Sequence, residues 1–547
     1  MNCEQVLATA VIDTLLRENY GGLGGQVRPG PVLTLPDGRL LPLRTDGFLA
    51  DYRLGPGAAV TLADVDAMVT ALSDPRDATG VAAFRGECRE ALTGMRLMGS
   101  RPVATDCHDS ATRFDALAAR LPHPAYPTWA SRTGWSEADT LRYAPEFMPM
   151  FPLSWAAVPA DAVVRGGAGA VPRWWPGMAD VGLPVTLART HALFPVHPLT
   201  VPALTGPALT GPAAAGPGGC VPGTVVAPRA WLRVRPTLST RTVAVSGREH
   251  LKLPLAASTL GLRNRRAIPP ATLADGALVH RVVRMAVTAD PWLGAHLLLA
   301  DDTSYAHAGH PYLGYLLRRL PSAAGPFVPV AALLAPAGDG WLVIDDLAGP
   351  DAAAWLRSYL DVLFGVAVRL FVRFGIALES HQQNLSVVPG PGGPRLLMKD
   401  FDGTLINYAR LAPALGAATP PPSEFLDQRL LTDSDSALAD VFITITVHLC
   451  AGAIAFGLAG RRRLPLESAL GLVRQSLTAA LDACALDDRG VPDAAAALLR
   501  ARVLDADRLP GKAMVTAGTL VDKARTGARD INKFYGTSGP NYLTVSA

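Results

Sequence analysis

The strongest constraint on the fold is a long apolar helix that leads directly into a polar hairpin. The segment AAAWLRSYLDVLFGVAVRLFVRFGI, which begins at Ala352, is apolar on nearly every side and predicts a central, mostly buried helix. It continues into ESHQQNLSVV at 379–388, and after the turn PGPGGP the chain reads RLLMKDFDG. Two β-rich runs around a Pro- and Gly-rich turn predict a hairpin. Acids, amides and a histidine therefore gather where the helix meets the hairpin.

The predicted hairpin places an amide opposite a carboxylate. Its turn is centred near Gly392, so Asn384 lies as far before the centre as Asp400 lies after it. Directly opposed residues have Cβ atoms about 4.5–5.5 Å apart, close enough for an amide oxygen and a carboxylate to share one cation. Oxygen ligands suit Mg²⁺, which also binds phosphate oxygens, so the hairpin favours an ATP site. The alternative is that Asn384 ends the helix and Asp400 begins a turn.

Two further polar residues, Glu379 and His381, lie at the junction between the helix and the first strand. A lone histidine is more often a hydrogen-bonded core residue than a catalyst. His381 is instead surrounded by other polar groups at a helix-to-strand junction. We therefore interpret His381 as a catalytic residue.

A second cluster of polar residues occurs upstream, in PTLSTRTV at 236–243 and the segment after it. In strand geometry Ser239 and Arg241 point to the same face, whereas Thr242 points to the other face or begins a turn. Several cations with hydroxyl groups can hold a polyphosphate without a glycine-rich loop, and the sequence contains no GxxxxGK[ST] motif. The alternative is a solvated basic edge strand that discourages aggregation. The side chains concerned are Ser239, Arg241, Thr242, Lys252, Arg263 and Arg265.

Length, charge and cysteine content narrow the class of protein. At 547 residues the chain is long enough for two or three domains. Its net charge is +3 and its basic residues are scattered, so neither a nucleic acid nor a membrane surface is an expected partner. The six cysteines lie far apart without a CxxC pair, which predicts neither a zinc site nor a disulfide framework. We expect small-molecule partners and a reducing, cytoplasmic location.

Changes in pattern along the chain predict a mixed α/β fold with three parts. Residues 1–175 contain helical patterns, including one that begins at Thr61. Residues 176–345 contain short strands, and residues 346–547 are mostly helical and include the hairpin. Within the second part, the Pro- and Gly-rich stretch at 199–219 predicts a long surface loop.

Two apolar segments could be mistaken for membrane or export signals. The segment VFITITVHLCAGAIAFGLAG at 441–460 is long enough to cross a bilayer. We expect a buried core helix, because His448 lies within it and nothing else in the chain has the character of a membrane protein. The N-terminal MNCEQVLATAVIDTLL carries Glu4 where a secretory signal needs basic residues, which predicts an ordinary amphipathic helix.

A series of motifs resembles the NRPS-independent siderophore synthetases, a family that includes the aerobactin synthetases. HPAYPTWASRTGW, YAPEF and LSWAAV, within 123–158, are similar to the family's N-terminal signature. FPVHP, PTLSTRT, HLKLPLAASTLGLR, GIALESHQQN and LLMKDFDG follow in the family's order, and LPGKAMV around Lys512 is similar to its late signature. Each motif alone is weak, whereas the ordered set is specific.

The resemblance implies a cupped-hand fold of thumb, fingers and palm, with ATP held between the fingers and the palm. It implies that a carboxylate, such as citrate or a related di- or tricarboxylate derivative, is activated as an acyl-adenylate with release of pyrophosphate. An amine or hydroxyl of a second substrate then attacks, which leaves an amide or ester and AMP. A homodimer is also implied.

The resemblance also assigns roles to residues at matching positions. The residues implied to bind the nucleotide and its phosphates are Ser239, Arg241, Thr242 and Lys252. The residues implied to act on the carboxylate and the α-phosphate are Arg263 and His381, with Lys252 as a third catalytic group. The residues implied to lie around Mg²⁺ are Glu379, Asn384 and Asp400, with Gln383 supporting the nucleotide site.

The chain departs from the family's pattern mainly in its N-terminal half. Tyr126 and Ala130 stand where a second histidine and a lysine are expected, and HPLT from His197 lacks the usual aromatic residue and glutamine. Lys399 stands where arginine is common. The N-terminal departures bear on the choice of substrate, whereas the nucleotide half is nearly intact.

Two other functions remain open from the sequence. A histidine and an asparagine before a strand, followed by a DF-type acid, also occur in small-molecule kinases, although no glycine-rich loop with a following lysine is evident before Ser239. The second alternative is a catalytically inactive nucleotide-binding or scaffold homologue. AMP and pyrophosphate as products would support a synthetase, ADP would support a kinase, and failure to bind ATP and Mg²⁺ would favour the inactive homologue.

Overall fold

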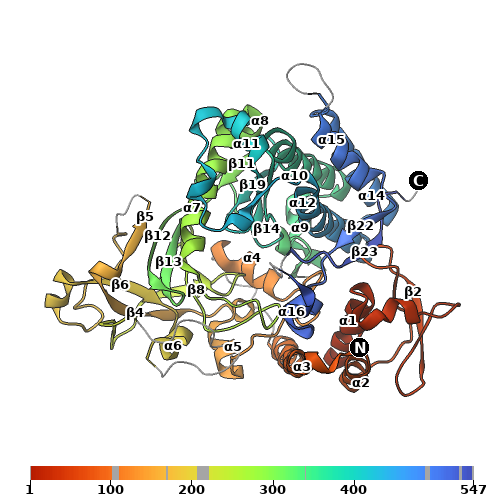
Figure 1. Cartoon of the computed structure of the whole chain (residues 1–547), viewed down its shortest axis with the longest axis horizontal. Coiled ribbons are helices and arrows are strands. Elements are labelled where there is room, and N and C mark those ends of the chain that lie inside the picture. The colour runs from red at the N-terminus through yellow and green to blue at the C-terminus, as the bar shows by residue number, and fades with distance from the viewer. Residues whose placement is uncertain are drawn as a thin grey trace.

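Three groups of secondary structure make up the fold (Figure 1). The computed structural model describes residues 2–101, 110–167, 171–205, 221–338, 340–486, 493–528 and 533–544. An N-terminal helical region lies at one lower corner in Figure 1, a large sheet region at the other, and a C-terminal helical region above both. The predicted mixed α/β fold with several parts is confirmed.

The N-terminal region consists of capped helices packed on a small sheet. Helix α1 begins after Asn2, which forms a capping box with Gln5, and α2 begins after Thr61, which does the same with Asp64. Both helices predicted in this region are confirmed. The elements are α1 Cys3–Arg17, β1 Val32–Thr34, β2 Leu40–Thr45, β3 Tyr52–Leu54, α2 Leu62–Leu72 and α3 Ala78–Ser100.

A nine-stranded sheet forms the second region. Its strand order is β5-β12-β13-β10-β9-β8-β4-β6, with β7 paired to β4, and helix α7 Pro270–Ala289 packs against β12. The strands are β4 Phe151–Pro159, β5 Val164–Gly166, β6 His191–Val196, β7 Val225–Val226, β8 Trp231–Pro236, β9 Thr242–Ala244, β10 Glu249–Lys252, β12 Asp301–His310 and β13 Leu313–Arg319. Because β4 and β5 precede residue 175, the expected boundary between the first two parts falls inside this sheet.

The segment 236–243 is a turn between two strands. Strand β8 ends at Pro236, β9 begins at Thr242, and Thr240 between them has a φ of 66°. The Ser239 hydroxyl accepts a hydrogen bond from the Thr242 backbone N–H at 3.1 Å. Short polar side chains compete in this way with strand pairing. Our expectation that Ser239 and Arg241 share one strand face is therefore wrong, because both lie in the turn.

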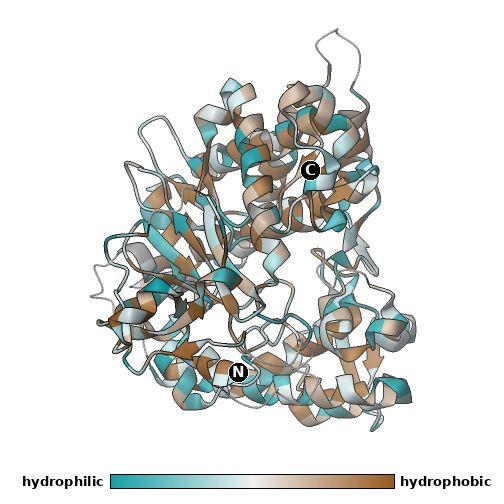
Figure 2. Ribbon diagram, turned by 60° about the vertical axis from the view of Figure 1, so that its left-hand side comes forward, coloured by the Kyte–Doolittle hydropathy of each residue, from teal (hydrophilic) through white to brown (hydrophobic). Residues whose placement is uncertain are grey.

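The C-terminal region is built around the predicted central helix. Helix α10 Ala352–Phe374 is confirmed, and Gly375 ends it at a φ of 63°. It packs against α14 Leu466–Asp482 and against the helical stretch Asp435–Gly460. That stretch is apolar and long enough to cross a membrane, but 83% of its most apolar window is buried inside the protein. Figure 2 shows hydrophobic residues along these packed helices, so the predicted core helix at 441–460 is confirmed.

The remaining helices and strands are distributed over the three regions. The helices are α4 Ser110–Ala119, α5 Glu137–Tyr143, α6 Val201–Thr205, α8 Pro291–His296, α9 Val343–Ala348, α11 Tyr408–Leu415, α12 Asp435–Val441, α13 Ala453–Gly460, α15 Ala494–Leu499 and α16 Lys523–Thr526. The strands are β11 Leu297–Leu299, β14 Val328–Pro329, β15 Pro336–Gly338, β16 Trp341–Leu342, β17 Ile376–Ala377, β18 Leu385–Val388, β19 Arg395–Met398, β20 Leu405–Asn407, β21 Leu431–Thr432, β22 Arg508–Gly511 and β23 Thr537–Pro540. Of the surface loop expected at 199–219, helix α6 forms the first part, and 206–219 lies outside the described residues.

The predicted hairpin is present, but its register differs by one residue from our expectation. Strands β18 and β19 pair in antiparallel fashion with Leu385 opposite Met398, in a sheet of order β11-β19-β18-β14. Continuing that register places Asn384 opposite Lys399, whose backbone N–H donates to the Asn384 carbonyl at 3.0 Å. The expected pairing of Asn384 with Asp400 is therefore wrong. A shift of one residue reverses the face on which a strand side chain lies, so the turn geometry decided the outcome.

Candidate active site

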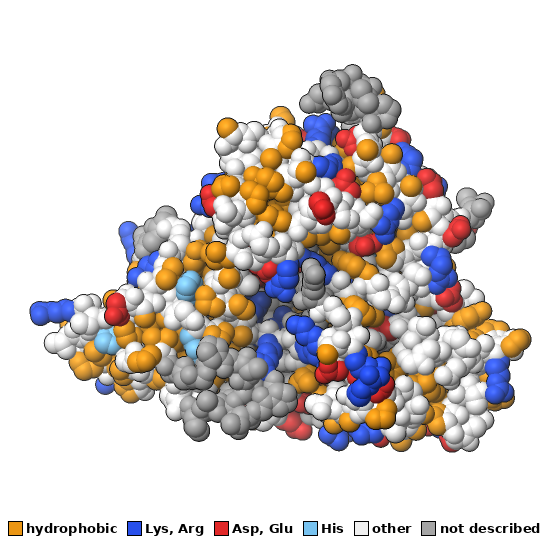
Figure 3. Space-filling model, viewed as in Figure 1, with side chains coloured by type: hydrophobic (Ala, Val, Ile, Leu, Met, Phe, Trp, Pro, Cys, Tyr) orange, Lys and Arg blue, Asp and Glu red, His pale blue; other side chains and the backbone are white. Residues whose placement is uncertain are grey.

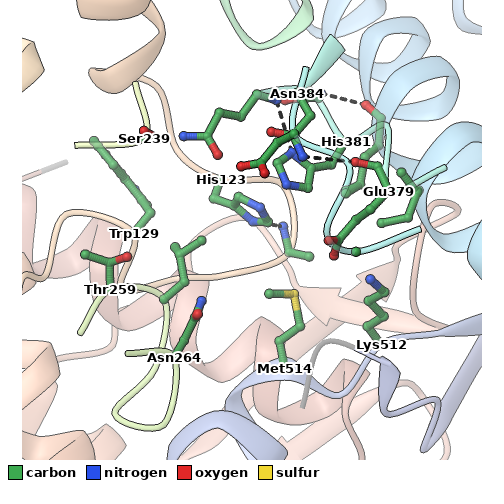
Figure 4. Close-up of a pocket in the computed structure, with 18 of the residues that line it drawn as sticks. His123, Trp129, Ser239, Thr259, Asn264, Glu379, His381, Asn384, Lys512 and Met514 are labelled. Carbon is green, nitrogen blue, oxygen red and sulfur yellow. Dashed lines mark hydrogen bonds between the residues drawn. The ribbon is translucent and has the colours of Figure 1, made fainter. Parts of the chain in front are cut away.

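A cavity of about 440 Å³ lies where the three regions meet. Figure 3 shows Lys and Arg side chains around the hollow at the centre of the molecule. Figure 4 shows Ser239 and Asn264 on one wall, Glu379 and His381 on the facing wall, and His123 between them. The cavity therefore joins the turn after β8 to the hairpin that follows α10.

Most of the predicted site residues share this one cavity. Those that line it are Ser239, Arg241, Glu379, His381, Gln383, Asn384 and Asp400. Thr242, Lys252 and Arg263 are not among its lining residues. Thr242 is buried in β9, where it pairs with Lys252 of β10. The structure thus brings together most of the predicted nucleotide and metal residues.

Arg263 binds the C-terminal segment rather than the cavity. Its guanidinium donates to the Ala517 carbonyl at 3.0 Å, and its backbone N–H donates to the Gly518 carbonyl at 3.0 Å. Its neighbours Arg265 and Arg266 line the cavity instead. In this geometry Arg263 joins the loop at 259–266 to the C-terminal segment at Ala517 and Gly518. These contacts give no support to the expectation that Arg263 orients a bound carboxylate.

Several cavity residues received no role from the sequence. They are His123, Trp129, Asn264, Arg266 and Lys512. All of them lie in the motifs HPAYPTW, GLRNRR and LPGKAMV. The motifs therefore marked segments that line the cavity, whereas the individual side chains that face it became evident only in three dimensions.

Lys252 lies between two acids at the edge of the cavity. Its Nζ atom is 2.6 Å from Asp400 Oδ1 and 3.0 Å from Asp402 Oδ2, and its side chain is only 3% exposed. Burial acts to raise the pKa of Asp400, but the charges of Lys252 and Arg318 outweigh it and hold that pKa well below its usual range. Burial and the Asp400 charge raise the pKa of Asp402. In this structure the single Lys252 ammonium is paired with both acids and presents no free charge to a phosphate.

Asp400 has an unusual backbone conformation that neighbouring side chains hold in place. Its φ of 69° lies in the left-handed region, which is uncommon for a residue other than glycine. The Asp400 backbone N–H donates to Asp302 Oδ2 at 2.9 Å. Asp302 in turn accepts two hydrogen bonds of 2.6 Å from Arg318. The buried pair of Asp302 and Arg318 therefore fixes the turn that carries Asp400.

Two partly buried histidines that line the cavity are neutral at neutral pH. Burial, together with the charge of Lys512, lowers the pKa of His381 to about 4. Burial, together with His381, lowers the pKa of His123 to about 3. The Nδ1 atom of His381 accepts a hydrogen bond from the Gln383 backbone N–H at 3.3 Å. The neutral ring therefore carries its proton on Nε2 and can donate a hydrogen bond from that atom.

A π-helical segment, Phe442–Gly452, connects two walls of the cavity. Gln382 donates through Nε2 to the Leu449 carbonyl at 2.6 Å, which holds the 379–384 segment against this helix. His448 Nε2 lies 3.0 Å from the Pro510 carbonyl, two residues before Lys512. A π-helix is uncommon and often occurs at functional sites. Here it fixes the positions of both the His381 segment and the Lys512 segment.

The oxygen donors near Asp400 match the chemistry of a Mg²⁺ site. The carboxylate and amide side chains of Glu379, Asn384, Asp400 and Asp402 line the cavity, and Mg²⁺ takes such ligands together with phosphate oxygens and water. Asn384 donates through Nδ2 to the Glu379 carbonyl at 3.1 Å, so its oxygen remains for a metal. Within the part of the chain that the structure describes, no three His, Cys, Asp or Glu side chains are grouped to hold an ion by themselves. The donor set fits a metal that also takes ligands from a bound phosphate.

Comparison with known sequences finds family matches over two parts of the chain. Residues 112–335 match the IucA / IucC family, and residues 353–527 match a family described as ferric iron reductase FhuF-like transporter. Aerobactin synthase of Escherichia coli is 25% identical over 390 residues, which cover 64% of this chain and 65% of that protein. The chain thus spans slightly less than two thirds of the length of this relative.

Solved structures share the whole fold. The petrobactin biosynthesis protein AsbB of Bacillus anthracis is 16% identical, with a TM-score of 0.76 over 98% of this chain and 95% of that chain. The ATP-bound aerobactin synthetase IucA of Klebsiella pneumoniae is 18% identical, with a TM-score of 0.69 over 99% of this chain and 100% of that chain. The family match over 112–335, the similarity to aerobactin synthase and the fold shared with these synthetases confirm the resemblance to the siderophore synthetases that the motifs predict.

Proposed function

We propose that this protein is an ATP-dependent ligase of siderophore biosynthesis. It adenylates a carboxylate, either citrate or a related di- or tricarboxylate derivative, and joins it to an amine or hydroxyl with release of AMP and pyrophosphate. The observation that carries this proposal is the single cavity that contains Arg241, Arg266 and Lys512 together with neutral His381 and the acids around Asp400. Attack of a carboxylate on a phosphate requires that repulsion between two anions be neutralised, and fixed cations supply that neutralisation.

The cavity offers separate groups for each part of this reaction. The residues proposed for the nucleotide and its phosphates are Ser239, Arg241, Thr242, Lys252 and Gln383. Ser239 and Arg241 lie on the sheet-region wall, and His381 lies on the facing wall, where its Nε2–H can donate to a substrate oxygen. Arg263 and Lys252 would act from just outside the cavity, through the loop and the acid pair that they bind. Lys252 would contact phosphate only after leaving one of its two acids.

Magnesium fits the oxygen donors described above, with Glu379, Asn384 and Asp400 as its proposed protein ligands. When bound, it would neutralise phosphate charge next to the carboxylate that is activated. We assign the family's thumb to residues 1–175, its fingers to 176–345 and its palm to 346–547. The homodimer and the cytoplasmic location stay predictions.

A screen for ATP–pyrophosphate exchange tests the proposed function directly. The acids to compare are citrate, a citrate monoamide, 2-oxoglutarate and a succinyl hydroxamate, each with ATP and Mg²⁺. Exchange that depends on one acid, with AMP as the nucleotide product after an amine or alcohol is added, is the expected result. Release of ADP would indicate a phosphotransferase instead, and absence of both ATP binding and exchange would indicate an inactive homologue.

Arg241→Ala should weaken the use of ATP. The Arg241 guanidinium lines the cavity and donates to the Ala267 carbonyl at 3.0 Å, which fixes its position. Loss of a charge-assisted contact to phosphate costs about 1.5–3 kcal/mol, or roughly ten- to a hundredfold in kcat/KM for ATP. Arg241→Lys should recover only part of the loss, because an ammonium does not replace a bidentate contact. The measurement is steady-state kinetics in which first ATP and then the acceptor is varied. A change in the KM for the acceptor alone, with kcat/KM for ATP unchanged, would contradict the prediction.

Asp400→Asn should raise the magnesium requirement and lower turnover. The substitution removes a carboxylate whose charge is balanced by Lys252, so the ammonium would be freed to compete with the metal for phosphate. The measurement is the exchange rate as a function of Mg²⁺ concentration. Asp427→Asn is the matched control, because Asp427 also lines the cavity but is paired with Arg429. An unchanged magnesium dependence would show that the metal lies elsewhere.

A further inference from the structure

Three buried side chains from distant parts of the chain form a closed hydrogen-bonded network. The Tyr126 hydroxyl, on a side chain only 1% exposed, donates to Glu87 Oε1 of helix α3 at 3.2 Å. Thr519 donates through Oγ1 to Glu87 Oε2 at 3.1 Å and lies 3.4 Å from the Tyr126 hydroxyl. This network lies outside the residues that line the cavity.

The network holds the backbone of the loop at 259–266. The opposite side of this loop lines the cavity. The Leu262 backbone N–H donates to Thr519 Oγ1 at 3.0 Å, and Thr519 in turn donates to Glu87. Gly261, at a φ of 116°, lies so close to Gly518 that an added Cβ would be 3.2 Å from the Gly518 Cα. Because only glycine combines that φ with such an approach, the loop is fixed against the C-terminal segment.

The same loop supplies part of the cavity wall. Thr259, Leu260, Asn264, Arg265 and Arg266 all line the cavity, and Figure 4 shows Thr259 and Asn264 beside it. A shift of about 1 Å in a positioning segment can cost a hundredfold in rate. The position of these side chains therefore depends on the buried contacts behind them.

We propose that Glu87, Tyr126 and Thr519 are positioning residues that hold the loop at 259–266 in the geometry that binds the carboxylate substrate. This inference rests on the proposed function for the identity of the substrate, whereas the hold on the loop is a property of the structure alone. It accounts for a departure from the family's motifs, because Tyr126 replaces an expected histidine with a hydroxyl that reaches Glu87.

Ala130, the second residue that departs from the family's motif, is also buried in a packing contact. Ala130 is 3% exposed, and an added Cβ on Gly94 of α3 would lie 2.8 Å from the Ala130 carbonyl and 3.2 Å from its Cβ. Its neighbours Trp129 and Ser131 line the cavity, but Ala130 does not. Tyr126 and Ala130 therefore both contact helix α3, and neither lines the cavity.

Hydrogen exchange tests the hold on the loop without reference to any activity. Tyr126→Phe should speed amide exchange in the peptide that spans 259–266 by about three- to tenfold, since it removes one buried hydrogen bond of the network. Tyr20→Phe is the matched control, because Tyr20 belongs to the same apolar core and its buried hydroxyl has no partner among the described residues. Equal exchange in the two variants would overturn the proposal.

Kinetics then test the consequence for the substrate. In ATP–pyrophosphate exchange, Tyr126→Phe and Thr519→Val should raise the KM for the carboxylate about five- to tenfold and change the KM for ATP less than about twofold. A merely structural role would lower the amount of active enzyme and leave both constants unchanged, which would overturn the proposal. If the parent shows no ATP–pyrophosphate exchange with any acid, the proposed function fails. Amide hydrogen exchange at 259–266 still tests whether the network holds the loop.

A pH series separates the carboxyl of Glu87 from its neighbours. Burial raises the pKa of Glu87 to about 7, and Glu90 on the same helix adds to the shift, while the Tyr126 and Thr519 hydroxyls and the Gly261 N–H act against it. The folded state then holds a proton that the unfolded chain releases near its ordinary value, so this contribution to stability is lost as the pH rises to about 7. Glu87→Gln should reduce the fall in melting temperature between pH 5 and pH 8 and keep the carboxylate KM near the parent's. An unchanged pH slope would show that the Glu87 carboxyl does not titrate in this range, which would overturn this account of Glu87.

Discussion

Replacement of His381 by alanine is expected to lower acyl-adenylate formation by at least about a hundredfold, because loss of one fixed hydrogen-bond donor to developing negative charge costs about that much or more. The loss of fold should be small, since the ring lines the cavity and its side chain accepts one hydrogen bond, from the Gln383 backbone. The measurement is ATP–pyrophosphate exchange together with a thermal melt. His296→Ala is the matched control, because His296 stacks on Trp292 outside the cavity and its loss should leave exchange unchanged.

The pH dependence gives an independent check on His381. Burial and the charge of Lys512 lower its pKa to about 4, so the imidazole stays neutral through the working range. Between about pH 4 and pH 6.5 the unfolded chain binds a proton that the folded state does not, so this histidine's contribution to stability is lost as the pH falls through that window. No decline in kcat/KM between pH 8 and pH 6 should come from His381. A His381→Ala variant with a melting temperature far below that of the parent would indicate that His381 has a structural role instead.

Local patterns predicted the elements that local physics determines. The apolar surface of α10 and the capping boxes of α1 and α2 fixed those helices, because their signals lie within a few residues. The register of the hairpin was missed by one residue, because the geometry of a Pro- and Gly-rich turn is not written in the pattern of the strands that flank it. The turn at Ser239 was missed because its own hydroxyl captures the Thr242 N–H.

The candidate site could be predicted as a set of segments and only partly as a set of side chains. Lys252 is paired with Asp400, which lies 148 residues away, and no local pattern indicates that contact. At the loop, Arg266 lines the cavity while Arg263 binds the C-terminal segment. Neighbouring arginines look equivalent in a sequence, and only tertiary packing distinguishes them.

Arg318→Met is expected to cost the protein about 3–5 kcal/mol in free energy of unfolding, the usual effect of removing one partner of a buried ion pair. Arg318 and Asp302 have side chains 4% and 2% exposed and are joined by two hydrogen bonds of 2.6 Å. Without the guanidinium, the Asp302 carboxylate would be buried unpaired beside Asp400, whose backbone N–H it binds. The left-handed turn at Asp400 would lose its support, so exchange activity should fall along with stability.

Chemical denaturation of three variants separates burial from pairing as the cause. Arg508→Met removes a partner from the pair with Asp51, which has the same two-bond geometry at 2.8 and 2.9 Å but side chains 44% and 53% exposed. An exposed pair of this kind should cost no more than about 1 kcal/mol. The double variant Arg318→Met with Asp302→Asn should regain part of the loss, because it removes the unpaired charge while the amide oxygen still accepts from Asp400. If the double variant is as unstable as Arg318→Met alone, the loss comes from packing of the arginine side chain, and the electrostatic account of this pair is wrong.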